Sequence, residues 1–256
     1  MLRRVLLLLV PLLWVAVEGV YAIDHKNLDE NRPLRVEDAY PIATGEIAIE
    51  VGGGLTLQRH GESRGVFPIE ILYGALPNLQ LGVGTTLLTD PSEIDEVKSG
   101  DLKLSGLYNF NQETLTLPAL GFKLALNLPT GVASSGVDVE LKALVTKSFD
   151  RLSFHFNAAY EFLNGTRADE RDGWYQFVLG ASYPIGAPKY TRTTLIADLF
   201  IEQASQRRKP DTFGAEIGFR HQLTPRVVLD AGIGTELAGP GDRSPFFLTT
   251  GVSIGF

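Results

Sequence analysis

The sequence predicts an all-β fold: a transmembrane, antiparallel, up-and-down β-barrel of about twelve strands with both termini on the periplasmic side. Three observations predict it. Apolar and polar residues alternate in segment after segment, as in residues 120–128, and a period of two is typical of strands. Short connections take turns with longer polar ones along the chain. The last strand ends on an aromatic residue, Phe256.

Residues 1–22 are predicted to be a secretory signal peptide. Arg3 and Arg4 give it a positive start, residues 5–17 are apolar, and Val20-Tyr21-Ala22 fits the small-residue cleavage pattern. The apolar stretch is shorter than the roughly 20 residues that a membrane-spanning helix needs, so cleavage is favoured over an anchor. No later stretch reaches roughly 18 apolar residues, which excludes a spanning helix from the mature chain.

Composition limits the classes of function. The formal net charge is −7, and because the signal peptide carries a net charge of +1, the mature chain stands at −8. An acidic chain is a poor partner for nucleic acid, so we expect none. Cysteine is absent, which excludes disulfides, thiolate catalysis and Cys-ligated metals. We expect no cofactor and no metal ion.

The mature chain is predicted to have two parts. Residues 23–42 are polar and contain Pro33 and Pro41, which predicts a periplasmic tail or a small plug in the lumen. Residues 43–256 are predicted to form the barrel. Turn signals place its strands near 43–58, 65–76, 78–89, 98–110, 114–129, 136–149, 152–163, 173–184, 190–203, 212–223, 226–238 and 245–256.

The connections test this topology independently. In an outer-membrane barrel the periplasmic connections are short and the outer ones longer and polar. The predicted tight connections are 76–78, 111–113, 149–151 and 223–225, with a longer one at 184–190. The predicted outer connections are 59–64, 90–97, 130–135, 164–172, 203–211 and 239–244. A soluble β-sandwich has no reason to sort its loops in this way, so we expect location in the bacterial outer membrane.

Aromatic residues gather near the predicted periplasmic strand ends, which favours a membrane-interface girdle over ordinary core aromatics. They are Tyr73, Tyr108, Phe110, Phe149, Phe154, Tyr183, Tyr190, Phe219 and Phe256. The final strand closing on Phe256 resembles the recognition signal of bacterial outer-membrane β-barrels. Phe256 is therefore the predicted assembly signal, and the barrel-assembly machinery a predicted partner.

The polar faces of the strands are predicted to line the lumen. The candidates are Glu46, Glu50, Glu70, Asp101, Lys103, Lys123, Asp138, Glu140, Lys142, His155, Glu161, Trp174, Arg192, Asp198, Glu202, Glu216, Arg220, Asp230 and Glu236. Acids outnumber bases, which predicts a hydrated interior that favours cations if a path is open. Ile196, Phe200 and Phe247 also fall inward and predict a constriction or an apolar solute patch. The sequence is compatible with an open or gated lumen and with a lumen that is filled by side chains.

Enzymatic readings find little support. Ser153 and His155 both face inward, His60 lies in a loop, and His221 has no serine in register. No nucleophile elbow and no His-x-x-x-His spacing occurs. The acidic residues 90–96 are typical of a solvated loop rather than a calcium site. We expect that the protein is not an enzyme.

Short motifs along most of the chain resemble a known family. They are Arg32-Pro33-Leu34, Glu37-Asp38-Ala39, residues 45–50, 100–104 and 118–121, the Leu-Pro-Thr-Gly corner at 128–131, and residues 147–152. They resemble the outer-membrane transporter family named for the meta pathway of phenol degradation. The resemblance implies passage of aromatic or other small hydrophobic compounds and carries over no catalytic or binding residue.

Two functions follow as expectations. The first is an outer-membrane channel or transporter for a small solute, passive or gated. The alternative is a non-conducting structural or interaction barrel that acts through its outer loops. Membrane lipid and lipopolysaccharide are expected partners in either case, the latter through Arg207-Arg208-Lys209. The sequence leaves the oligomeric state open.

Overall fold

The structure, a computed structural model, describes residues 23–57, 64–89, 97–132, 134–187, 190–240 and 246–256. The predicted signal peptide at 1–22, His60, and most of the predicted outer connections 59–64, 90–97 and 239–244 lie outside these residues. The strands are β1 (Ile47–Leu57), β2 (Arg64–Leu76), β3 (Leu79–Thr89), β4 (Val97–Ser99), β5 (Leu102–Asn111), β6 (Ala119–Leu128), β7 (Asp138–Phe149), β8 (Leu152–Phe162), β9 (Gly173–Ile185), β10 (Thr193–Glu202), β11 (Thr212–Thr224), β12 (Val227–Ala238) and β13 (Phe246–Gly255).

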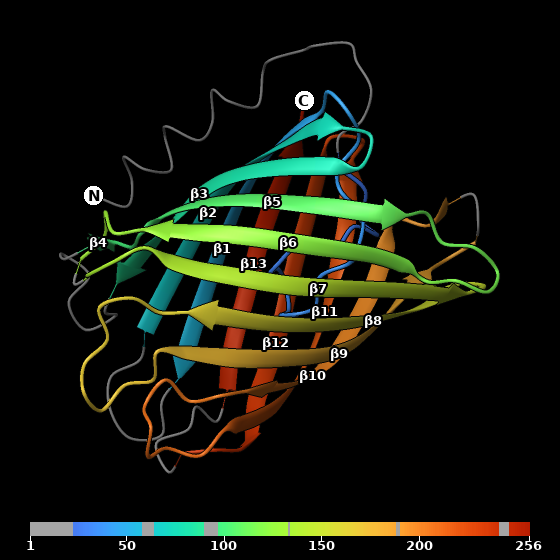
Figure 1. Cartoon of the computed structure of the whole chain (residues 1–256). Helices are drawn as coiled ribbons and strands as arrows, with labels where there is room; N and C mark the ends of the chain where they lie inside the picture. The colour runs from blue at the N-terminus through green and yellow to red at the C-terminus, as the bar shows by residue number, and fades with distance from the viewer. Residues whose placement is uncertain (1–22, 58–63, 90–96, 133, 188–189, 241–245) are drawn as a thin grey trace.

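The described strands form one closed antiparallel sheet (Figure 1). Apart from β4 and β5, each strand pairs with the next along the chain, and β13 pairs with β1 to complete the ring. β4 and β5 both pair with β3 and form one barrel strand that is interrupted at Gly100 and Asp101. The barrel therefore has twelve strands, which confirms the predicted fold class. No helix among the described residues is long and apolar enough to cross a membrane.

Both chain ends of the barrel lie on the same side, as an even number of strands requires. Phe256 N donates to Ile47 O at 2.9 Å, and Ile47 N donates to Phe256 O at 3.2 Å. Phe256 thus extends the pairing of the last strand with the first. We call this side the terminal end and the opposite side the loop end.

Predicted and observed strand boundaries agree within a few residues except at β6. This strand begins at Ala119 rather than 114, because Thr114 and Leu117 form a turn of their own. Thr114 N donates to Leu117 O, and Leu117 N donates to Thr114 Oγ1, both at 3.0 Å. The prediction of a tight connection at 111–113 was wrong, since the connection runs through residues 112–118.

The outer surface of the barrel is apolar. In β6 the residues with even numbers point outward, and Leu120, Phe122 and Leu124 are 37–42% exposed, while Lys123 and Ala125 are buried on the inner face. Exposed aromatic rings lie at the terminal end, where Tyr108 meets Phe110 with centroids 5.1 Å apart, and at the loop end, where Tyr160 meets Phe162 with centroids 4.7 Å apart. An apolar surface that encircles a barrel in this way requires lipid around it.

Replacing Leu124 by Arg tests this surface. A charge on the lipid face costs about 2–4 kcal/mol at the membrane midplane and about 0–1 kcal/mol near the interface. We expect Leu124→Arg to lower the free energy of unfolding in lipid vesicles by the larger amount, as measured by urea titration. Leu115→Arg is the control, because Leu115 is fully exposed in the 112–118 connection. Equal losses for the two variants would contradict contact between β6 and lipid.

Candidate functional site

Residues 23–42, which we call the inner segment, lie inside the barrel (Figure 1). Leu28, Leu34 and Val36 are each no more than 3% exposed, although they belong to no strand. Asp38 gives the segment its shape, since its carboxylate accepts from Leu28 N and Tyr40 N, both at 2.8 Å. The segment is thus folded on itself within the bore.

A basic zone of the inner wall binds two acids of the segment. Lys123 on β6 donates to Glu30 at 3.0 Å and to Glu37 at 2.7 Å. Lys142, its register partner on β7, contacts the same two carboxylates, and Lys103 on β5 donates to Glu30 at 2.6 Å. Three ammonium groups on neighbouring strands repel one another unless acids lie between them. Glu30 and Glu37 supply that compensation.

An acidic zone on the other wall binds the cations of the segment. Arg32 pairs with Glu50 on β1 and lies 3.9 Å from Asp230 on β12. Arg220 on β11 in turn donates to Asp29 of the segment at 2.5 Å. Wall and segment therefore carry complementary charges here too.

Arg35 forms a second contact with the acidic zone, because its side chain pairs with Glu216 and lies 3.6 Å from Glu202. Its backbone N also donates to Glu216 at 2.7 Å. The guanidinium lies 3.8 Å from the Phe200 ring centre and 5.0 Å from that of Phe247. Arg35 is thus held by charge and by two aromatic faces.

The apolar inward patch is covered by the same segment. Leu28, Leu34 and Val36 pack against Val178, Ile196 and Phe200, with Phe247 at the margin. The sequence predicted a constriction or a solute patch at Phe200 and Ile196. The structure instead covers these side chains with the chain's own residues.

Wall side chains also satisfy the backbone of the segment. Val36 N donates to Asp198 at 3.1 Å, and Glu37 N donates to Asn157 at 2.8 Å. Ala39 N donates to Thr146 at 3.1 Å, and Ile42 N donates to Gln80 at 2.9 Å. A buried segment outside the sheet needs such partners, because unpaired backbone groups are costly.

At the terminal end the segment meets the connection between β5 and β6. The Tyr40 hydroxyl donates to Glu113 at 3.3 Å, and Glu113 also accepts from Lys147 at 2.9 Å and from Ser148 N at 2.7 Å. Burial acts to raise the pKa of Glu113, but the Ser148 hydrogen bonds and the Lys147 ammonium outweigh it and hold that pKa below its usual range.

The structure distributes the predicted lumen residues over three environments. Those in contact with the inner segment are Glu50, Lys103, Lys123, Lys142, Asp198, Glu202, Glu216, Arg220 and Asp230. Those on the inner wall or at its loop end, with partners from the wall and loops, include Glu70 with Ser105, Glu140 with Lys142, Glu161 with Asn127, Asp101 with Ser134, and Asp138 with Asn164. Glu46 is buried beside the segment's exit, Trp174 is half-buried, Glu236 lines a cavity described below, and Arg192 is exposed in the connection before β10.

His155 lies between two hydroxyl groups. Its Nε2 is 2.9 Å from Ser182 Oγ and its Nδ1 is 3.1 Å from Thr146 Oγ1. Ser153 instead bonds Ser148 at 2.9 Å. The two residues weighed as a catalytic pair are thus engaged with other partners. Among the described residues, no three His, Asp or Glu side chains gather as a metal site would need.

The contacting residues that the sequence did not predict as lumen residues are Asp29, Glu30, Arg32, Arg35 and Glu37, although Arg32 and Glu37 belong to the family motifs. The available signal was charge: the predicted wall carries more acids than bases, and residues 23–42 contain three basic residues, Lys26, Arg32 and Arg35. Arg32 and Arg35 therefore pair with acids of the wall, while the five acids of the segment keep its own net charge negative.

The comparisons with known proteins agree with this architecture. Residues 31–251 match the family model described as "Putative MetA-pathway of phenol degradation". The chain belongs to this family. The match starts within the inner segment, so the family pattern includes part of that segment as well as the barrel. No curated protein matches the sequence.

Solved structures share the fold at low sequence identity. An outer membrane channel from Pseudomonas putida F1 has a TM-score of 0.67 and 16% identity, with 90% of this chain and 100% of that chain covered. NanC porin follows with a TM-score of 0.59 and 12% identity over 80% and 98%. KdgM porin has a TM-score of 0.55 and 11% identity over 82% and 99%. The fold is therefore that of outer-membrane β-barrels.

Glu30→Gln tests the hold of the basic zone on the segment. Removing one partner from a buried ion pair costs about 3–5 kcal/mol, because the other charge stays buried and unpaired. We expect release of the segment and cleavage by trypsin after Arg35 on the order of a hundredfold faster than in the wild type, measured by mass spectrometry.

Asp24→Asn is the matched control. It also removes one negative charge from the segment, but the Asp24 side chain is 52% exposed and lies outside the basic zone. Its cleavage rate should stay within about twofold of the wild type, as surface substitutions cost little. Equal rates for Glu30→Gln and the wild type would show that these ion pairs do not retain the segment.

Proposed function

We propose that the protein is an outer-membrane channel for small solutes and that the inner segment gates it. One observation carries the proposal: the bore is filled by a segment that the wall holds through side-chain ion pairs, hydrogen bonds and apolar packing, not through strand pairing. Such a segment can leave without breaking the barrel sheet. Its covalent link to the barrel is the short stretch of residues 43–46 before β1.

The barrel fold and the family support this proposal. The fold is shared with a channel and two porins, and the complete ring of apolar outer residues suits the outer membrane. The family description adds aromatic catabolism, so we propose aromatic or other small hydrophobic compounds as the solutes. Catalysis forms no part of the proposed function.

The charge of the interior bears on ions that pass with the solute. The inner segment itself contains five acids and three Lys or Arg residues. It therefore adds negative charge to a wall whose predicted lining is already acidic. A path that opens beside it should favour cations over anions.

The non-conducting alternative also has an observation in its favour. Leu28, Leu34, Val36 and Ala39 of the inner segment are almost fully buried, as expected of a permanent filling. If the segment never moves, the barrel is a structural or interaction module that acts through its outer loops. Movement of the segment separates the two functions.

A reversible tether tests the gate. A Cβ built on Gly121 of β6 would lie 3.3 Å from Ala39 Cβ, close to the roughly 3.5–4.5 Å of disulfides. The chain has no other cysteine, so Ala39→Cys with Gly121→Cys gives one unambiguous bridge. In planar bilayers we expect cation-favouring conductance steps from the reduced double variant and loss of at least about nine-tenths of the current after oxidation.

Each single-cysteine variant is a control, and its conductance should be the same in the presence of oxidant and of reductant. Uptake of phenol into proteoliposomes should follow the same pattern as the current. If the disulfide bridge leaves the conductance unchanged, the proposal that the inner segment is a gate is wrong, whereas the proposal that the protein is a channel is retained. Silence from both the reduced variant and the wild type, with phenol uptake at the level of empty liposomes, would favour the non-conducting alternative.

A further inference from the structure

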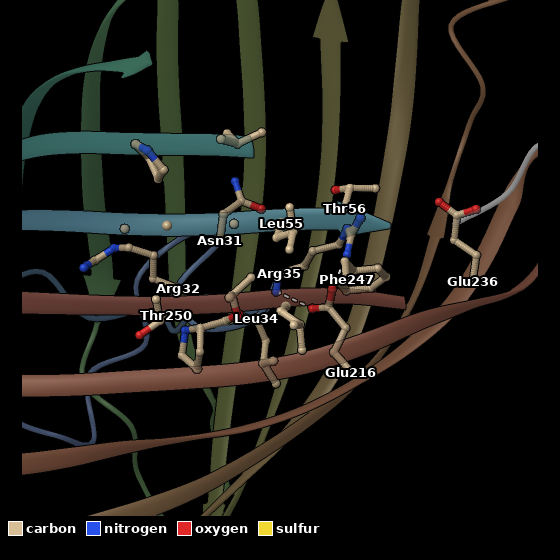
Figure 2. Close-up of a pocket in the computed structure, with 18 residues that line it drawn as sticks. Asn31, Arg32, Leu34, Arg35, Leu55, Thr56, Glu216, Glu236, Phe247 and Thr250 are labelled. Atoms are coloured by element: carbon tan, nitrogen blue, oxygen red, sulfur yellow. Dashed lines mark hydrogen bonds and ion pairs between the residues drawn. The ribbon is translucent and has the colours of Figure 1, made fainter. Parts of the chain in front are cut away.

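A cavity of about 250 Å³ lies between the inner segment and the wall of the barrel. Its wall side is formed by β1, β2 and β13, where Gly54, Val66 and Phe247 face inward. Its other side is the segment from Asn31 to Arg35 (Figure 2). Since Gly54 and Phe247 occupy the halves of β1 and β13 remote from the chain ends, the cavity lies on the loop side of the segment.

Glycines leave this space open. A Cβ on Gly52 would meet Pro68 Cγ at 2.9 Å and Arg32 Cδ at 3.1 Å, so Gly52 lets the segment approach the wall. A Cβ on Gly54 would meet nothing closer than 3.7 Å. Position 54 could therefore hold a larger side chain, and the sequence leaves it empty.

The charges around the cavity are balanced. The charged residues that line it are Arg32, Arg35, Glu216 and Glu236, two of each sign. Arg35 pairs with Glu216 (Figure 2), and Arg32 pairs with Glu50, which lies just outside the lining. An anionic guest would have to break one of these pairs, because both arginines of the lining are already paired.

The remaining lining suits an apolar body with a polar end. Leu34, Val66, Pro68 and the Phe247 ring supply apolar surface, while Asn31 and Thr56 carry an amide and a hydroxyl. An apolar cavity of about 150 Å³ accommodates benzene, whereas drug-sized ligands occupy roughly 300 Å³ or more. The volume here corresponds to one ring with a small substituent.

We propose that this cavity binds a small uncharged molecule with a ring-sized apolar body and a hydrogen-bonding group. This inference rests on the proposed channel function. Within that function, the cavity is the site that binds the solute on the loop side of the inner segment before the segment moves. The pairing of Arg35 with Glu216 excludes anions of the same size. The site thus selects by charge before the segment moves.

Fluorine NMR of the full mature protein in micelles tests the site with 4-fluorophenol as the probe and 4-fluorobenzoate as its anionic match. We expect saturable binding of 4-fluorophenol at pH 7 and at least tenfold weaker binding of 4-fluorobenzoate. Gly54→Leu should fill the cavity and weaken binding of 4-fluorophenol at least tenfold. Gly106→Leu is the control, because a Cβ on Gly106 of β5 would face outward 3.7 Å from Leu81 Cδ2, away from the cavity, and it should bind within twofold of the wild type.

Val66→Phe provides a second filling from β2, to be used alongside Gly54→Leu if that variant fails to fold. Absence of saturable binding, or equal binding by the wild type and a folded filled variant, would overturn the proposal. Tighter binding of the benzoate would overturn the assigned class. Binding should persist in the oxidised Ala39→Cys, Gly121→Cys protein, where the cavity floor is fixed. Binding without flux thus removes only the channel, and flux without binding removes only this site.

Discussion

The interior of this barrel depends on the pairing of buried charges between its wall and residues 23–42. Lys103, Lys123 and Lys142 lie side by side on one part of the wall, and carboxylates such as Glu50 and Glu216 dominate the other. Neither zone could exist in a dry bore alone, because an uncompensated buried charge costs several kcal/mol. The segment supplies acids to the first zone and arginines to the second, so the two charge patterns fix where it lies.

Because ion pairs help to hold the inner segment, the segment fills the bore only under conditions in which those pairs persist. A buried ion pair gains little over a well-packed apolar contact, because desolvation offsets most of its Coulomb energy. Water entering a loosened bore would solvate both partners and lower the cost of separation. A segment held in this way is well positioned without being strongly bound, whereas the sheet around it rests on continuous backbone pairing. The same side chains, Arg32 and Arg35, form the floor of the cavity on the loop side.

The barrel was predictable from sequence because its rules are local. Side chains alternate because a strand has a period of two, and short and long connections alternate because successive strands run in opposite directions. These rules placed a strand boundary wrongly where side chains form a turn of their own, as at Thr114 and Leu117. The inner segment has no periodicity, and its partners lie up to about two hundred residues away, as Arg220 does from Asp29. Its polar composition and its prolines favoured a periplasmic tail, with a small plug as the alternative. Only the assembled wall distinguishes them.

Occupancy of the cavity and opening of the bore are linked by thermodynamics. A solute that merely fills the space above Arg35 needs the segment in place, so it stabilises the closed state by its own binding energy. Opening is favoured only by a solute that binds better once the segment has moved, for instance through contact with Phe200 and Ile196, which the segment covers in the closed state. Those side chains would present a new apolar surface on release. In the proposed gate, the wall would thus offer a first site that depends on the segment and a second that replaces it. A solute that fits both would pass, whereas one that fits only the first would hold the segment in place.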